Sequence, residues 1–213
     1  KKEIYYISAE TSAQALASPH LEGFKSKNIS VLIMTDAIDQ FWLPMIGSFK
    51  EKKFTSITQG KINLDELDSK NKDKKNKSND VKDKLDKEYV DLIAQLKVVL
   101  GDHVKDIRLS SKLTDSPVCL VADDGDMDIA MEQLMAQRDS NYKGAPRILE
   151  INGDHSLIKN MKSLLSKKES NDLVSDAGTL LFEQARLMEG KMPADPAQFS
   201  KIMNQFLLKA IPN

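Results

Sequence analysis

The sequence lacks features that several common protein classes require. One cysteine in 213 residues excludes an intrachain disulfide framework and suits a reducing compartment. That residue, Cys119, lies in the apolar run 118–122, so we expect a buried, inert thiol rather than a nucleophile. No apolar stretch approaches the ~20 residues of a membrane-spanning helix, so we expect no membrane partner. The chain has no initial methionine, and we interpret it as a piece of a longer protein without a signal peptide.

The sequence also lacks an excess of charge of one sign and lacks clusters of catalytic residues. The 31 basic and 32 acidic residues give a formal net charge of -1, which argues against an electrostatic nucleic-acid binder. The three histidines, His20, His103 and His155, lack the spacing of zinc ligands, and no serine lies in a nucleophile-elbow pattern. No glycine-rich turn follows the first strand to cradle a phosphate. We therefore expect no catalytic residue, bound cofactor or metal in this chain.

One carboxylate pair keeps an enzymatic alternative open. Asp36 and Asp39 follow the apolar run 31–34, and functional sites of α/β folds collect where parallel strands end. Two carboxylates there can hold magnesium, which would make the chain a magnesium-dependent α/β enzyme domain. The competing interpretation, which we favour, is that Asp36 caps the following helix.

The pattern of apolar residues predicts two units. Strands at 4–8, 31–34 and 54–58 alternate with helical stretches, which predicts a small three-layer α/β subdomain with a parallel sheet over residues 1–65. Residues 69–80 contain no apolar side chain, so 66–80 is predicted to be a polar linker. A lysine patch for nucleic acid is the weaker interpretation, because acids dilute it and no aromatic is interleaved.

Residues 81–213 are predicted to form an α+β domain with a three-stranded sheet. We expect a helix at 81–100 that Gly101 ends, and a last helix that Asp195 caps and Pro196 begins. The remaining expected elements are strands at 104–110, 118–123 and 147–152 and helices at 126–140, 155–167, 172–189 and 195–211.

Two apolar clusters are candidate binding surfaces. The first is a stripe on the helix expected at 126–140, where methionine supplies most of one helix face. From pattern alone ordinary core is the favoured interpretation, but methionine is adaptable and common on surfaces that bind unrelated partners. The second is Phe41-Trp42-Leu43, whose three consecutive apolar residues span more than one helix face, so that one aromatic is expected to be exposed. The candidate residues are Phe41, Trp42, Met127, Met131, Leu134 and Met135.

The last two helices are candidates for self-association. Both are apolar over a wide face, and a two-fold axis would combine two helices from each chain into a dimeric four-helix bundle. The alternative is that both simply cover the sheet of their own protomer. The expected interface residues are Leu173, Ala177, Leu180, Leu181, Met188, Phe199, Ile202, Met203, Phe206 and Leu207.

Several ordered motifs closely resemble the carboxyl-terminal third of the ninety-kilodalton heat-shock chaperone family, in particular its bacterial type. The resemblance covers nearly the whole chain except residues 69–80. The motifs are Ile4-Tyr5-Tyr6-Ile7-Ser8, Ser18-Pro19-His20-Leu21-Glu22, Val31-Leu32-Ile33-Met34-Thr35-Asp36-Ala37-Ile38-Asp39, Arg108-Leu109-Ser110, Leu113-Thr114-Asp115-Ser116-Pro117 and Arg147-Ile148-Leu149-Glu150-Ile151-Asn152.

The resemblance implies a fragment of an ATP-dependent molecular chaperone that acts in protein folding and the heat-shock stress response. Residues 1–65 look like the end of the family's middle domain, and 81–213 like its dimerization domain. ATP and magnesium belong to the parent protein, whose nucleotide pocket and catalytic arginine lie in parts absent from this chain. Family client contacts map onto the methionine helix and onto Phe41-Trp42, which favours an exposed methionine stripe. A passive dimerization scaffold with that stripe buried is the remaining alternative.

The resemblance also implies partners and a compartment. A homodimer, partly folded client proteins and co-chaperones are the implied partners. Gly153 stands where relatives usually have proline, a small change in loop stiffness. The chain lacks the acidic tail of eukaryotic cytosolic relatives and an endoplasmic-reticulum retention signal, so we expect a bacterial cytoplasmic origin rather than an organellar one.

Overall fold

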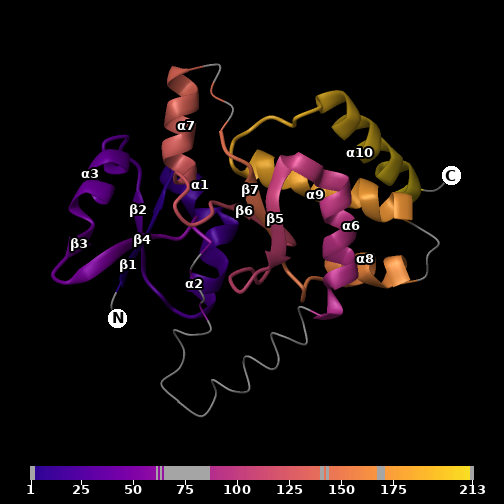
Figure 1. The fold of residues 1–213 in the computed structure, drawn as a ribbon, viewed down its shortest axis with the longest axis horizontal. Coiled ribbons are helices and arrows are strands. Elements are labelled where there is room, and N and C mark those ends of the chain that lie inside the picture. The colour runs from indigo at the N-terminus through magenta and orange to yellow at the C-terminus, as the bar shows by residue number, and fades with distance from the viewer. Residues whose placement is uncertain are drawn as a thin grey trace, which may run out of the picture.

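A computed structural model describes residues 3–60, 62, 64, 87–139, 142, 144–166 and 171–211. Two units lie side by side, the first drawn in indigo and purple and the second in magenta to yellow (Figure 1). The predicted linker 66–80 and the start of the helix predicted at 81–100 lie outside the described residues. Among the described helices, none combines the length and the apolar character that crossing a membrane requires.

The first unit is built on a four-stranded sheet. The strand order is β2 (Val31–Met34), β1 (Glu3–Ser8), β4 (Lys52–Ser56) and β3 (Ser48–Phe49). The three predicted strands are parallel as expected, because β1 runs parallel to both β2 and β4, but the sheet as a whole is mixed. The short antiparallel strand β3 was not predicted. The helix that follows Asp36 in the sequence is α3 (Asp39–Ile46), which ends where Gly47 adopts a positive φ of 65° and turns the chain back toward β4.

Three short helices cover one face of this sheet. They are α1 (Ser12–Leu16), the 3₁₀ turn η1 (Pro19–Leu21) and α2 (Glu22–Ser26). Pro19 begins η1, which the side chain of Ser18 caps. The core beneath them contains Tyr5 and Phe24, whose rings meet edge to face with centroids 5.1 Å apart.

The second unit contains the predicted three-stranded sheet. Its order is β5 (Val104–Leu109), β7 (Arg147–Ile151) and β6 (Val118–Val121), with β5 parallel and β6 antiparallel to β7. Helices α6 (Val90–Leu100), α8 (Ser156–Ser166) and α9 (Asn171–Met188) share one apolar core with it. Among the described residues of this unit, α7 (Ile129–Arg138), α10 (Pro196–Ala210) and the 3₁₀ turn η3 (Gly101–His103) are the remaining helical elements. Gly101 ends α6, and the Asp195 carboxylate caps α10 by accepting two backbone N–H groups at 3.0 Å, both as predicted.

The two units are joined by polar contacts. Gln59 forms a parallel β-bridge with Ala122, which follows β6. The Glu22 carboxylate on α2 accepts the backbone N–H groups of 114, 115 and 116, and the hydroxyl of Ser116 donates to it. Lys112, 1% exposed, reaches from the second unit to the carbonyl oxygens of Ile57 and Gln59 at 3.4 and 3.2 Å. These contacts hold α2 and the residues after β4 against the second unit.

Candidate functional site

The methionine helix α7 stands clear of the core. Met127 and Met135 are 39% and 38% exposed, while Met131 and Leu134 are half-buried. Within α7 only Ile129 and Glu132 are buried. Helix α7 begins at Ile129, later than predicted, so Met127 precedes it. No residue of the stripe is buried, so within this chain the stripe is not ordinary core. Figure 1 shows α7 projecting from the rest of the fold.

One aromatic side chain of the pair on α3 is exposed and the other is half-buried, as the pattern predicted. Phe41 is exposed, whereas Trp42 is half-buried, and its ring packs edge to face on Phe54 with centroids 6.1 Å apart. Phe54 in turn contacts Tyr6 on β1 at 6.5 Å. Burial and the nearby charge of Asp128, the N-cap of α7, raise the pKa of Tyr6 to about 12. This aromatic chain connects α3 to β1 through Phe54 of β4.

The α3 segment exposes more apolar surface than was predicted. The additional residues lie just before, within and just after the helix, and Met45 is 84% exposed. Their signal in the sequence was the apolar run interrupted by Pro44 and Gly47, which leaves several side chains without a sheet to cover. They are Ile38, Met45, Ile46 and Phe49.

Asp36 and Asp39 do not form an open carboxylate pair. Asp39 is buried, and its carboxylate accepts the indole N–H of Trp42 at 2.7 Å and the backbone N–H of Asp36 at 3.3 Å. Among the described residues, no group of three or more potential ligands is placed to hold a metal ion. The predicted cap is also wrong: the N-cap of α3 is Ile38, which makes no side-chain cap bond, and Asp39 stabilises the first turn instead. The Asp39 carboxylate thus serves the local structure of α3, to which Asp36 contributes its backbone groups.

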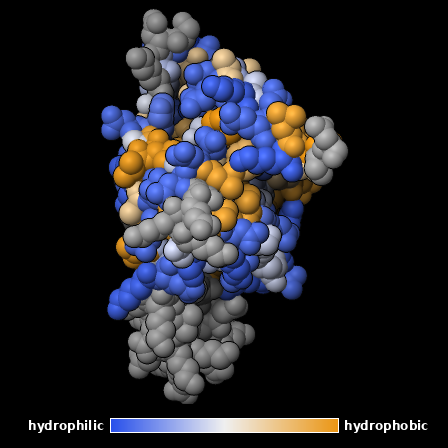
Figure 2. Space-filling view, turned by 90° about the vertical axis from the view of Figure 1, so that its right-hand side faces the viewer, coloured by the Kyte–Doolittle hydropathy of each residue, from blue (hydrophilic) through white to orange (hydrophobic). Residues whose placement is uncertain are grey.

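Some of the predicted interface residues on α9 and α10 are buried in the protomer, and others lie on its surface. Ala177, Leu181 and Ile202 are buried in their own protomer, so they offer little area to a second chain. Leu173, Leu180, Phe199 and Phe206 are half-buried, and Met188, Met203 and Leu207 are exposed. Apolar side chains beyond the predicted set, including Leu187, Met192, Leu208 and Ile211, extend this surface. Viewed from the end of the molecule that carries α10, apolar patches alternate with polar side chains (Figure 2).

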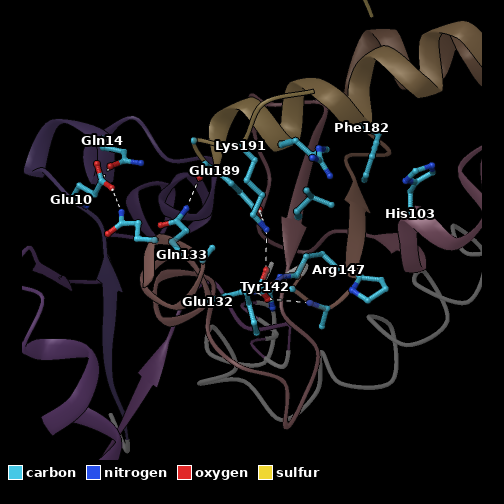
Figure 3. A pocket seen from close by; sticks show the side chains of 18 of the residues that line it. Glu10, Gln14, His103, Glu132, Gln133, Tyr142, Arg147, Phe182, Glu189 and Lys191 are labelled. Atoms are coloured by element: carbon cyan, nitrogen blue, oxygen red, sulfur yellow. Dashed lines mark hydrogen bonds and ion pairs between the residues drawn. The ribbon is translucent and has the colours of Figure 1, made fainter. Parts of the chain in front are cut away.

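A polar cavity of about 700 Å³ lies beside α7, between α1, β7 and the end of α9. Figure 3 shows Glu132 and Arg147 at its floor, with Lys191 reaching down to Glu132. Gln133 of α7 donates to the backbone carbonyl of Glu189, where α9 ends. This charged cavity was not predicted, because each of its residues is unremarkable on its own in the sequence.

Two buried titratable side chains line a second, smaller pocket, and both are held neutral. Burial raises the pKa of the Cys119 thiol well above its usual range, which supports the prediction of an inert cysteine. Burial and the nearby Lys112 ammonium lower the pKa of His20 to about 3. Neither side chain is poised for nucleophilic or acid–base chemistry.

Comparison with known proteins decides the family. The model of the Hsp90 protein family matches residues 1–212. The chain belongs to the Hsp90 family. It is 40% identical over 211 residues to the chaperone protein HtpG of Roseobacter denitrificans, covering 98% of this chain and 33% of that protein. It is 37% identical over 209 residues to HtpG of Wolbachia sp. subsp. Brugia malayi, and 34% identical over 201 residues to HtpG of Streptomyces coelicolor. Those matches cover 98% and 94% of this chain and 32% and 31% of the relatives, so the chain spans about a third of their length.

The buried carboxyl group of Glu189 should make the stability of this Hsp90-family chain depend on pH. Burial raises its pKa from 4.5 to about 7, although Lys191 and Arg147 oppose that shift. The folded protein therefore keeps a proton between pH 4.5 and 7 that the unfolded chain has lost. The stabilisation is complete below pH 4.5 and is lost as the pH rises toward 7, on the order of 3 kcal/mol in all.

Glu189→Gln removes this titration, so the variant should be more stable than the parent at pH 8 and similar at pH 4.5. Urea unfolding at pH 5, 6, 7 and 8 measures the difference in the free energy of unfolding. His20 contributes in the opposite direction as the pH rises toward 6.5, but it is common to both proteins and cancels in the difference. Equal pH slopes for parent and variant would contradict the assignment.

Proposed function

We propose that this chain is the client-binding and dimerization part of an ATP-dependent bacterial chaperone. In this proposal residues 1–65 end the middle domain, 66–80 form a linker, and 81–213 form the dimerization domain. Family membership supports the proposal, and so does the HtpG name of relatives matched over nearly the whole chain. The observation that carries the client-binding half is the solvent exposure of Met127, just before α7, and of Met135 within it, with Met131 half-buried between them. Suppression of the aggregation of an unfolded protein by this chain tests that half.

Clients would bind through many weak apolar contacts. Methionine side chains adapt to differently shaped partners, and the exposed apolar residues around α3 add a second adaptable surface. Two copies in a dimer would multiply these contacts through effective concentration. ATP and magnesium would act in the domains that precede this part of the parent protein, where closure would change the distance between the two client surfaces.

The dimer would form through the outer faces of α9 and α10. Leu207, Leu208 and Ile211 are exposed in the single chain, with Leu208 at 76%. An apolar face of this kind at the end of a chain is typical of a self-complementary two-fold interface. Two helices from each protomer would give the four-helix bundle. A passive scaffold is less favoured, because it would leave the exposed α7 stripe without a role.

Replacing Met203 and Leu207 together by aspartate should raise the dimer dissociation constant at least tenfold. Both side chains are exposed in the protomer, so the substitution places charges in the interface without opening the core. Analytical ultracentrifugation measures the constant. Val98→Asp, on the exposed face of α6, is the matched control and should leave the dimer intact. A monomeric parent at tens of micromolar, or an unchanged constant in the double variant, would refute this interface.

A further inference from the structure

The methionine helix is held by polar side chains along its length. Asp128 caps it with a 3.0 Å bond to the N–H of Ala130, and the hydroxyl of Thr58 in the first unit donates to Asp128 at 2.8 Å. One turn later, Glu132 pairs with Arg147, and Gln133 donates to the main chain at the end of α9. Gln137 in the last turn donates to Glu10 at 3.1 Å. Ile129 is the one apolar residue of α7 in the core.

Glu132 is the centre of these contacts. Its Oε2 accepts from the guanidinium of Arg147, and its Oε1 lies 3.0 Å from the ammonium of Lys191. The same guanidinium donates to the carbonyl of Met127 at 2.9 Å, just before the helix begins. The backbone at Gly144 passes so close that a Cβ there would lie 2.3 Å from Glu132 Oε1. The carboxylate is thus covered, doubly paired and 2% exposed.

A buried ion pair constrains a helix differently from an apolar contact. An arginine–carboxylate pair has a preferred geometry and direction, whereas an apolar side chain tolerates rotation about the helix axis. Rolling α7 about its axis would pull Glu132 away from Arg147 and Lys191 and leave buried charges unpaired. The cavity beside α7 leaves room for such a roll, because its walls include Glu132, Gln133 and Ala136 of the helix itself.

We propose that Glu132, clamped by Arg147 and Lys191, is a positioning residue that sets the rotation of α7 and keeps the methionine face in solvent. The inference rests on the proposed function, because it assigns this exposure to client binding. Without the clamp, α7 rolls toward the adjacent cavity and buries Met131 and Met135 at the expense of the client surface.

The test replaces the clamp by an apolar pair, Glu132→Leu with Arg147→Met. Because a buried ion pair replaced by well-packed apolar residues is often neutral or stabilising, the melting temperature should hold or rise. Oxidation of Met131 and Met135 by dilute hydrogen peroxide, followed by mass spectrometry, should slow at least threefold. Suppression of the aggregation of a denatured enzyme should need at least fivefold more chaperone. Met45, on α3, is the internal reference for peroxide reactivity.

Lys191→Arg keeps the second positive charge beside Glu132 and should leave both oxidation and client holding near the parent values. A folded double variant whose α7 methionines oxidise as fast as in the parent would overturn the inference. So would a loss of client holding that matches the loss of folded protein, since that is the signature of a merely structural role. A parent chain that holds no client would refute the proposed function instead, while the oxidation rates would still report on the clamp.

Discussion

Replacing Met127, Met131 and Met135 together by serine should weaken binding of an unfolded protein about a hundredfold. Full burial of a methionine contributes about 1.5–3 kcal/mol, and these partly exposed side chains have roughly 1 kcal/mol each still to gain on binding. Three such losses amount to roughly 3 kcal/mol, or about two decades in the dissociation constant. The free energy of unfolding should change by only about 1 kcal/mol, because the core of the second unit contains none of the three.

Two control variants separate a surface role from a core role. Met161→Ser removes a methionine that is 2% exposed in α8, so it should cost ~2–5 kcal/mol of stability. Val98→Ser changes an apolar side chain of α6 that is 80% exposed and lies outside both proposed surfaces, so it should affect neither stability nor client binding. Fluorescence anisotropy of a labelled, permanently unfolded protein measures binding, and urea unfolding measures stability. If the triple variant loses several kcal/mol of stability, the stripe is core and the proposed client surface is wrong.

Much of the fold was predictable because its determinants are local. Alternating apolar runs predicted the three parallel strands of the first unit and the three-stranded sheet of the second, and both are confirmed, although β3 makes the first sheet mixed. Gly101 and Asp195 act at helix ends through backbone geometry that neighbouring residues determine. The resemblance of ordered motifs predicted the Hsp90 family, and the family comparison confirms it.

The failures share a physical cause. The helical spacing of the methionine stripe does not show whether its face is turned toward the core or toward solvent. The orientation depends on Glu132, whose partners Arg147 and Lys191 lie 15 and 59 residues away in the sequence. The strand β3 and the early end of α3 depend on how Gly47 turns the chain onto β4. The client and dimer surfaces remain predictions, since each needs a partner.

The contacts that join the two units could not be predicted from the sequence either. Lys112 and Glu150 are charged residues that a pattern-based analysis assigns to the surface, yet both are almost completely buried. Glu150 on β7 faces Arg108 at 2.8 Å and Lys112 at 3.9 Å, and the hydroxyl of Ser110 donates to it at 2.9 Å. Arg108 and Lys112 in turn donate to main-chain carbonyls of residues 57–60 in the first unit.

Glu150→Ala should therefore lower the free energy of unfolding by ~3–5 kcal/mol, because it leaves two cations at the joint without their buried counter-charge. Both units should lose stability, because Arg108 and Lys112 bind the loop after β4 in the first unit as well as the sheet of the second. Urea unfolding followed by Trp42 fluorescence for the first unit, and by far-ultraviolet circular dichroism for the whole chain, measures it.

Asp154→Ala removes a carboxylate of an exposed ion pair with Lys159 and is the matched control, expected to change stability by less than ~0.5 kcal/mol. Lys112→Met retains most of the buried stem and removes one of the two charges. Combined with Glu150→Ala, it should cost less than the sum of the two single changes, because Lys112 and Glu150 belong to one network. Strict additivity, or a loss confined to the second unit, would mean that the charges around Glu150 do not couple the two units.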